Sequence, residues 1–220
     1  MPSGKLRELP AKNQIDKGIS QYMGKIFCIM GKSATGKDTI YKKLLADEKL
    51  NLKKIVTYMT RPIREGEKSG EEYFFIDEAE VERLTNAGKI VELRAYNTVH
   101  GIWKYMTVED ENIDLKSGTD YLIIGTPESY EKCVTHFGKE IMVPILVTVD
   151  DGVRLERALK RERKQEHPKY EEMCRRFLAD AEDFSEEKLA HAGIEKCFEN
   201  DFLEECYSKI TDYILSHGKN

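Results

Sequence analysis

A glycine-bracketed loop between an apolar run and a helical run constrains this chain most. The run KIFCIM at residues 25–30 is followed by Gly31-Lys32-Ser33-Ala34-Thr35-Gly36-Lys37, and a helical stretch, IYKKLLADEKL, comes soon after. The spacing G-x-x-x-x-G-K in a strand–loop–helix context is typical of a phosphate-binding loop. The glycines let successive N–H groups face inward, and the helix N-terminus adds the positive end of its dipole. Because Lys37 adds a mobile cation, the sequence predicts a polyphosphate site; a plain glycine turn is the alternative.

One position in this loop departs from the usual pattern. Asp38 stands where a Ser or Thr normally supplies a hydroxyl near Mg²⁺. Either Asp38 binds the metal, directly or through water, or it turns aside and leaves that task to Thr39. The residues expected around the phosphates are Gly31, Ser33, Ala34, Thr35, Gly36, Lys37, Asp38 and Thr39.

Apolar runs rich in β-branched residues alternate with longer segments of helical period along most of the chain. This alternation is typical of strands joined by crossover helices. Thr126 followed by Pro127 predicts a helix start, and Asp77 with Glu80 has the spacing of a capping box. The sequence therefore predicts an α/β fold with a mostly parallel central sheet, its strands near residues 25–30, 54–58, 121–126 and 141–149.

Two regions differ from this alternation. Residues 57–108 hold several short β-like runs and a single helix near 77–87, so we expect an inserted β-rich lobe. Residues 1–22 are polar with no sustained period, and we expect a flexible leader ahead of one domain over 23–220. A short docking helix is the alternative for the leader.

The composition of the chain argues against nucleic-acid and membrane partners. The 35 basic and 40 acidic residues give a formal net charge of −5, which argues against a nucleic-acid binder. No stretch approaches the roughly 18 consecutive apolar residues needed to span a bilayer. The five cysteines are scattered and never form a C-x-x-C pair, so neither a disulfide framework nor a zinc site is expected. We therefore expect a cytoplasmic protein without membrane or nucleic-acid partners.

A second anion site is predicted downstream of the loop. Arg61 and Arg64 flank Pro62, and each guanidinium offers a planar fork that pairs with phosphate oxygens. Tyr73 supplies a hydroxyl donor nearby along the chain. The chain thus carries two separate candidate sites for phosphate groups.

The pattern around these residues resembles a known family. Thr60-Arg61 to Phe75 follows T-R-x-x-R-x-G-E-x-x-G-x-x-Y-x-F, which is similar to the GMP-binding segment of guanylate kinases. The resemblance extends over residues 24–215. It implies that Arg61, Arg64 and Tyr73 hold the acceptor phosphate and that Thr57 touches the guanine. It also implies that Glu92 accepts from the guanine N1–H and 2-amino group, and a solvated strand charge is the alternative for Glu92.

The chain departs from this family after residue 92. His100-Gly101-Ile102 stands where the family has Tyr-Gly-Ser, so an imidazole takes the place of a phosphate-binding phenol and a base-reading hydroxyl is lost. His100 is thus a candidate acceptor contact, with an ordinary half-buried histidine as the alternative. Aspartates usual in the strand matching Leu122 to Gly125 are also absent. These departures bear on guanine selectivity and on the metal arrangement.

Arginines recur on the segment after residue 150. Arg154, Arg157 and Arg161 share one helical stripe, and a solvated helix face is the alternative. The resemblance implies that Arg157, Arg161 and Arg176 belong to a helical lid, residues 154–180, that closes over ATP and, with Lys37, serves catalysis. It also implies that Asn200 contacts adenine, and a plain helix cap is the alternative.

Taken together, the resemblance implies a nucleoside monophosphate kinase on a P-loop kinase fold. Its reaction would be ATP + GMP to ADP + GDP, with Mg²⁺, small nucleotides as partners, and a monomer or homodimer. One alternative is a ribose 1,5-bisphosphate phosphokinase, which resembles this chain at Gly-Lys-Asp in the loop. Another is an inactive guanylate-kinase-like binding module.

Overall fold

The computed structural model describes residues 23–64, 66–71, 73–98 and 101–218. The predicted leader, residues 1–22, and the candidate His100 lie outside the described residues.

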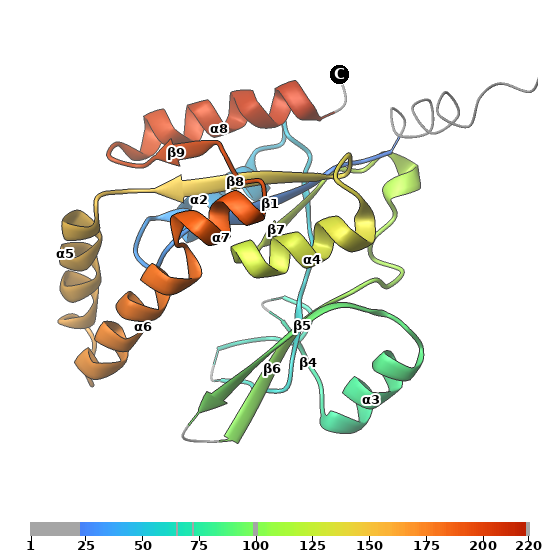
Figure 1. Ribbon diagram of the computed structural model, residues 1–220, viewed down its shortest axis with the longest axis horizontal. Helices are drawn as coiled ribbons and strands as arrows, with labels where there is room; N and C mark the ends of the chain where they lie inside the picture. Colours follow the sequence, from blue (N-terminus) through green and yellow to red (C-terminus); the bar gives the residue numbers. More distant parts are fainter. Residues whose placement is uncertain (1–22, 65, 72, 99–100, 219–220) are drawn as a thin grey trace, which may run out of the picture.

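A five-stranded sheet forms the centre of the molecule (Figure 1). All its strand pairs are parallel, which confirms the predicted α/β fold with a parallel central sheet. The strands follow the order β2 (Lys53–Lys54), β7 (Tyr121–Ile124), β1 (Ile26–Met30), β8 (Met142–Thr148) and β9 (Cys197–Glu199). Every residue of β1 is buried, as a strand covered on both faces requires.

Helices cover both faces of this sheet. Successive side chains of a strand point to opposite faces, so Phe27 and Ile29 enter one apolar cluster and Ile26 and Cys28 the other. The first cluster includes α2 (Lys37–Ala46) and α8 (Leu203–His217), and the second includes α4 (Pro127–Phe137) and α7 (Glu186–His191). The phosphate-binding loop joins β1 to α2, at the carboxyl edge of the sheet where ligands of parallel α/β folds bind.

Two predicted helix starts are confirmed. The Thr126 hydroxyl accepts from the Ser129 N–H at 3.3 Å, and the Ser129 hydroxyl accepts from the Thr126 N–H at 2.8 Å, with Pro127 opening α4. At α3 (Glu78–Asn86), the Asp77 carboxylate accepts from the Glu80 N–H at 2.9 Å, but the Glu80 carboxylate pairs with Arg83, so the helix start is confirmed without the reciprocal bond of a capping box. These caps satisfy N–H groups that the first turn of a helix leaves without partners.

A second, four-stranded sheet lies below the central sheet in Figure 1. Its order is β4 (Phe74–Phe75), β3 (Tyr58–Met59), β6 (Gly101–Val108) and β5 (Ile90–Thr98), and β5 and β6 form a long antiparallel hairpin. Val81 and Leu84 of α3 pack on Met106 and Val108 of this sheet, forming a small core of its own.

The predicted strand over residues 54–58 is wrong. Lys53–Lys54 form the exposed edge of the central sheet, whereas Tyr58–Met59 pair within the second sheet. Ile55 is buried between them, and its N–H donates to the Leu122 carbonyl at 3.0 Å. The apolar run is therefore a crossing between two sheets rather than one strand.

Two helices after β8 lie beside the phosphate-binding loop. These are α5 (Asp151–Glu162) and α6 (Tyr170–Asp183), which contact each other. Elsewhere in the chain, a short 3₁₀ helix, η1 (Leu115–Ser117), precedes β7. In the part of the chain that the structure describes, every helix is too short or too polar to cross a membrane.

Candidate functional site

The loop after β1 needs both of its flanking glycines. Gly36 has φ 89°, a left-handed conformation that costs glycine little. A Cβ added at Gly31 would meet the Val147 carbonyl oxygen at 2.4 Å, and one at Gly36 would meet the Asn200 side chain at 2.3 Å. The loop therefore closes tightly against β8 and Asn200, and Thr35 is buried within it.

The loop ends at an uncapped helix start. Gly36 is the N-cap of α2, and no side chain there accepts from the first-turn N–H groups. Such amides, together with the helix dipole, form an anion site. The Lys37 ammonium is 3.6 Å from the Asp38 carboxylate, and their side chains are 15% and 67% exposed. Lys37 is thus held inward while Asp38 remains open to solvent.

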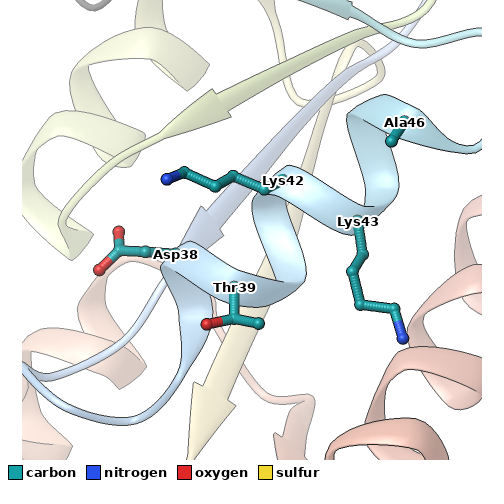
Figure 2. A pocket seen from close by; sticks show the side chains of 5 residues that line it. All are labelled: Asp38, Thr39, Lys42, Lys43 and Ala46. Atoms are coloured by element: carbon teal, nitrogen blue, oxygen red, sulfur yellow. The ribbon is translucent and has the colours of Figure 1, made fainter.

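A pocket runs along the side of α2 beyond this loop (Figure 2). Asp38 and Thr39, in the first turn of α2, line the pocket together with Lys42, Lys43 and Ala46. Lys43 points away toward α8 and pairs with Glu204 at 2.6 Å. Both predicted metal-binding residues, Asp38 and Thr39, therefore line this pocket and also lie next to the phosphate-binding loop.

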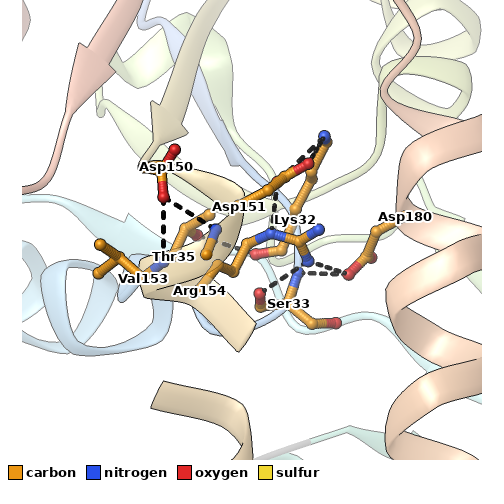
Figure 3. Close-up of polar contacts among 9 residues, drawn as sticks. Lys32, Ser33, Thr35, Asp150, Asp151, Val153, Arg154 and Asp180 are labelled. Carbon is orange, nitrogen blue, oxygen red and sulfur yellow. Dashed lines mark hydrogen bonds and ion pairs between the residues drawn. The ribbon is translucent and has the colours of Figure 1, made fainter. Parts of the chain in front are cut away.

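An internal ion pair joins the loop to α5 and α6 (Figure 3). The Ser33 N–H donates to Asp180 Oδ2 at 2.7 Å, and Arg154 Nη1 donates to the same oxygen at 3.0 Å. Arg154 also donates to Asp151 at 3.0 Å and to the Ser33 carbonyl at 3.2 Å. Its side chain is 1% exposed and lies over the Phe177 ring at 4.1 Å. Arg154 is therefore a buried strut, and the solvated-face interpretation is wrong for it.

The arginines that the resemblance assigns to the lid lie differently from one another. Arg157 donates to the Asn200 carbonyl at 3.1 Å, and Arg176 donates to the Ser33 hydroxyl at 3.1 Å. Arg161 is exposed. Asn200 is buried and donates to the Thr35 carbonyl at 2.7 Å, while its Oδ1 has no partner among the described residues. Arg176 and Asn200 thus contact the loop, Arg157 contacts Asn200, and Arg161 is open to solvent.

The second predicted anion site is organised by a residue that the sequence analysis did not assign. Glu67 accepts from the Arg61 fork at 3.0 and 2.7 Å and from the Arg64 N–H at 2.8 Å. Arg61 is only 5% exposed, whereas the Arg64 side chain is exposed. The signal for Glu67 was present in the Gly-Glu of the motif, but its partner could not be read from spacing.

Tyr73 connects this second site to the loop. Its ring meets that of Tyr105 edge-on at 6.3 Å. Burial raises the pKa of the Tyr73 hydroxyl, and the neighbouring Tyr105 and the negative charge of Asp38 act in the same direction. Tyr73, which directly precedes β4, therefore lies within electrostatic range of Asp38 in the first turn of α2. Thr57 is half-buried, and its carbonyl accepts from the Phe74 N–H at 2.9 Å.

Glu92 is not a solvated strand charge, so that alternative is wrong. The residue is 3% exposed, and it accepts from the Thr107 hydroxyl at 2.9 Å and from Arg94 at 3.0 and 3.2 Å. Arg94 and Thr107 were not predicted, and nothing in the sequence marked either.

Carboxylates do not gather into a metal cage within the described ranges. No group of three or more His, Cys, Asp or Glu side chains there could hold an ion alone. A magnesium ion bound with phosphates requires only one or two protein carboxylates. Asp38, exposed at the mouth of the loop, fits that requirement.

Comparisons with known proteins agree on one family. Residues 23–112 match the family model described as guanylate kinase. A guanylate kinase of Novosphingobium aromaticivorans is 32% identical over 126 residues, covering 55% of each chain. One of Anaplasma phagocytophilum is 41% identical over 70 residues, covering 32% of this chain and 33% of that protein. The chain thus spans at most about half the length of these curated relatives.

A solved structure matches over a longer stretch. The crystal structure of guanylate kinase from Anaplasma phagocytophilum superposes with a TM-score of 0.62 at 21% identity, covering 90% of this chain and 88% of that one. At this identity the likeness establishes the fold.

Proposed function

The chain belongs to the guanylate kinase family, and we propose that it transfers the terminal phosphoryl group of ATP to a nucleoside monophosphate, with GMP as an acceptor. The observation that carries the proposal is the approach of two anion sites. The uncapped start of α2 with Lys37 forms one and the Arg61–Arg64 segment with Tyr73 forms the other, and the charge of Asp38 acts on the Tyr73 hydroxyl, so the two sites lie within electrostatic range of each other.

Phosphoryl transfer needs little covalent help from a protein. It needs in-line positioning, neutralised phosphate oxygens and exclusion of water. The loop amides and Lys37 hold the donor phosphates, while Arg64 and Tyr73 hold the acceptor phosphate. Arg61 joins them by exchanging Glu67 for phosphate oxygens, because a guanidinium forms bidentate pairs with carboxylates and with phosphates alike.

The lid arginines complete the charge balance. Arg176 already lies at the Ser33 hydroxyl beside the loop, and Arg157 lies at Asn200. Arg161 is exposed and free to move toward the transferring group when the lid closes. An arginine that arrives only with both nucleotides bound protects ATP from hydrolysis. The Oδ1 of the buried Asn200 is an acceptor without a partner among the described residues, so it suits the amino group of adenine as a donor.

Magnesium enters the proposal as a cofactor held by Asp38 or Thr39 together with phosphate oxygens. When bound, the ion neutralises charge on the donor phosphates. Asp38 would supply a hard oxygen ligand, and the nearby Lys37 would offset the repulsion between that carboxylate and the phosphates.

We also propose a cytoplasmic location. The chain's cysteines are all free thiols, and unpaired cysteines are usual in a reducing compartment.

A coupled assay of ADP release tests the proposed reaction. Purified full chain with ATP and Mg²⁺ is titrated with GMP, dGMP, AMP, UMP and ribose 1,5-bisphosphate. Turnover with GMP supports the proposal. Turnover with ribose 1,5-bisphosphate alone would favour the related phosphokinase, and no turnover together with no ATP binding in calorimetry would favour an inactive binding module.

A further inference from the structure

The buried carboxylate of Glu92 is nearly saturated by protein donors. Its Oε1 accepts from the Thr107 hydroxyl at 2.9 Å and from Arg94 Nη2 at 3.2 Å. Its Oε2 accepts from Arg94 Nε at 3.0 Å. An ionised carboxylate offers about four lone-pair positions in all. Glu92 therefore has one acceptor position unused by these three donors, at Oε2.

The strands place this cluster on one face of the hairpin. Glu92 and Arg94 are two residues apart on β5, so their side chains leave the same face. Thr107 is the cross-strand partner of Glu92 on β6, next to a register shift between Ile90 and Glu92. A bulge of this kind re-aims the side chains around it.

The face turns toward the central domain rather than toward open solvent. The α4 helix packs against β5, and its Cys133 lies within electrostatic range of the pair. Burial and, to a smaller extent, the negative charge of Glu92 raise the pKa of the Cys133 thiol to about 12. The side chains of Glu92 and Arg94 are 0% and 15% exposed. The ion pair is thus buried at the position that the resemblance to guanylate kinases assigns to recognition of the acceptor base.

This arrangement restricts what Glu92 can recognise. Guanine presents two donors on one edge, the N1–H and the 2-amino group, and a free carboxylate accepts from both. With Arg94 in place, Glu92 accepts only one. The Arg94 guanidinium has five N–H donors, gives two to Glu92 and also interacts with the Tyr96 hydroxyl, which leaves a donor for a carbonyl oxygen of the base. The pair therefore suits a base with an N–H beside a carbonyl, and it draws little from the 2-amino group.

We propose that Arg94 is a specificity-determining residue, and that the acceptors are 6-oxopurine nucleoside monophosphates, IMP as well as GMP. The proposal rests on the proposed function, because it concerns the acceptor site of that same reaction. Hypoxanthine keeps the N1–H and the 6-oxo group of guanine and lacks only the 2-amino group. Adenine has an amino group at position 6 and an acceptor at N1, so it would meet Arg94 and Glu92 with the wrong polarity.

The test compares kcat/KM for GMP, IMP and AMP. We expect the native chain to use IMP within about 10-fold of GMP and to use AMP far less. Arg94→Met frees Glu92 to accept both guanine donors, so the ratio of GMP to IMP should rise by about 10-fold or more. Arg83→Met on α3, whose ion pair with Glu80 is exposed, is the matched control and should leave the ratio unchanged.

Two further variants keep the test decisive if Arg94→Met unfolds. Arg94→Lys keeps the positive charge but ends the two-point grip on Glu92, so the ratio should rise in the same direction by a smaller factor. Glu92→Gln, with Arg94 unchanged, should alter the ratio of GMP to IMP little. A native ratio above about 1,000, or a ratio that Arg94→Lys leaves unchanged, overturns the role of Arg94. Failure of the native chain to release ADP with any acceptor would instead overturn the proposed reaction.

Discussion

The Asp180 carboxylate lies 3.0 Å from the Arg154 guanidinium and 2.7 Å from the Ser33 N–H, so one side chain of α6 holds both α5 and the phosphate-binding loop. The pair is mostly buried, with side-chain exposures of 1% for Arg154 and 16% for Asp180. Residues 33, 154 and 180 are far apart in sequence, and the ion pair fixes their relative positions in the fold.

Replacing Arg154 should destabilise the protein strongly. Arg154→Met leaves Asp180 without its ion-pair partner, and breaking a buried pair in this way costs about 3 to 5 kcal/mol. We expect the free energy of unfolding, measured by denaturant titration, to fall by roughly this amount. Arg175→Met on α6 removes an exposed pair with Glu172 and should change it by less than about 1 kcal/mol. Equal effects of the two substitutions would contradict a buried strut.

The second anion site makes a kinetic prediction. Arg61→Lys keeps the positive charge but loses the planar fork that Glu67 now holds at 3.0 and 2.7 Å. We expect KM for the acceptor to rise by about 10-fold or more while KM for ATP stays within about 2-fold. A parallel rise in both constants would show that the substitution disturbs the whole site rather than the acceptor pocket.

Features that depend on contiguous residues could be predicted from the sequence. The loop from Gly31 to Gly36, the cap at Thr126 and the strand at Ile26–Met30 each depend on near neighbours. The run at 54–58 failed because an apolar segment does not reveal that it crosses from one sheet to another. The edge strand β9 (Cys197–Glu199) was missed because three residues carry too little periodicity.

The site shows the same division. Motif spacing indicated Lys37, Arg61 and Tyr73, but it could not indicate which acid would pair with which arginine. The bond between Ser33 and Asp180 spans 147 positions, and the one between Arg157 and Asn200 spans 43. Such contacts are products of the tertiary fold, so local sequence patterns do not contain them.

The cysteines give a prediction that involves no substitution. Thiolates react with disulfide reagents, and thiols do not. Burial raises the pKa of Cys133 to about 12 and of Cys206 to about 11, and it raises that of Cys28 well above its usual value. Cys174 and Cys197 are exposed. At pH 8 we expect two thiols to react rapidly and the other three to react only after unfolding, as counted with a chromogenic disulfide. Rapid reaction of three or more would contradict the packing of α4 and α8.

These raised pKa values also predict a pH dependence of stability. In the unfolded chain Cys133 ionises near pH 9, whereas in the folded protein it remains protonated until about pH 12. The unfolded state therefore binds fewer protons across this window, and stability falls as pH rises through it. Cys133→Ser should flatten the fall, measured by thermal melting between pH 8 and pH 11. An unchanged slope would show that other groups cause it.

The dependence of activity on Mg²⁺ concentration can show whether Asp38 or Thr39 binds the metal. If Asp38 holds Mg²⁺, Asp38→Asn should raise the Mg²⁺ concentration for half-maximal activity by about 10-fold or more, because a charged ligand becomes neutral. Thr39→Val should then have little effect. The reverse result would assign the metal to the Thr39 hydroxyl, and Asp38 would then pair with Lys37 without binding the metal.

The exposed Arg161 is the best test of lid chemistry, because Arg176 already donates to Ser33 of the loop and Arg157 to the Asn200 carbonyl. If Arg161 acts only in the transition state, Arg161→Ala should lower kcat by about 10³-fold and change nucleotide binding little. Arg163→Ala, at the exposed end of α5, is the matched control and should leave kcat within about 2-fold. Equal losses in kcat and in ATP affinity for Arg161→Ala would assign Arg161 to ground-state binding, because an interaction present before the reaction cannot favour the transition state selectively.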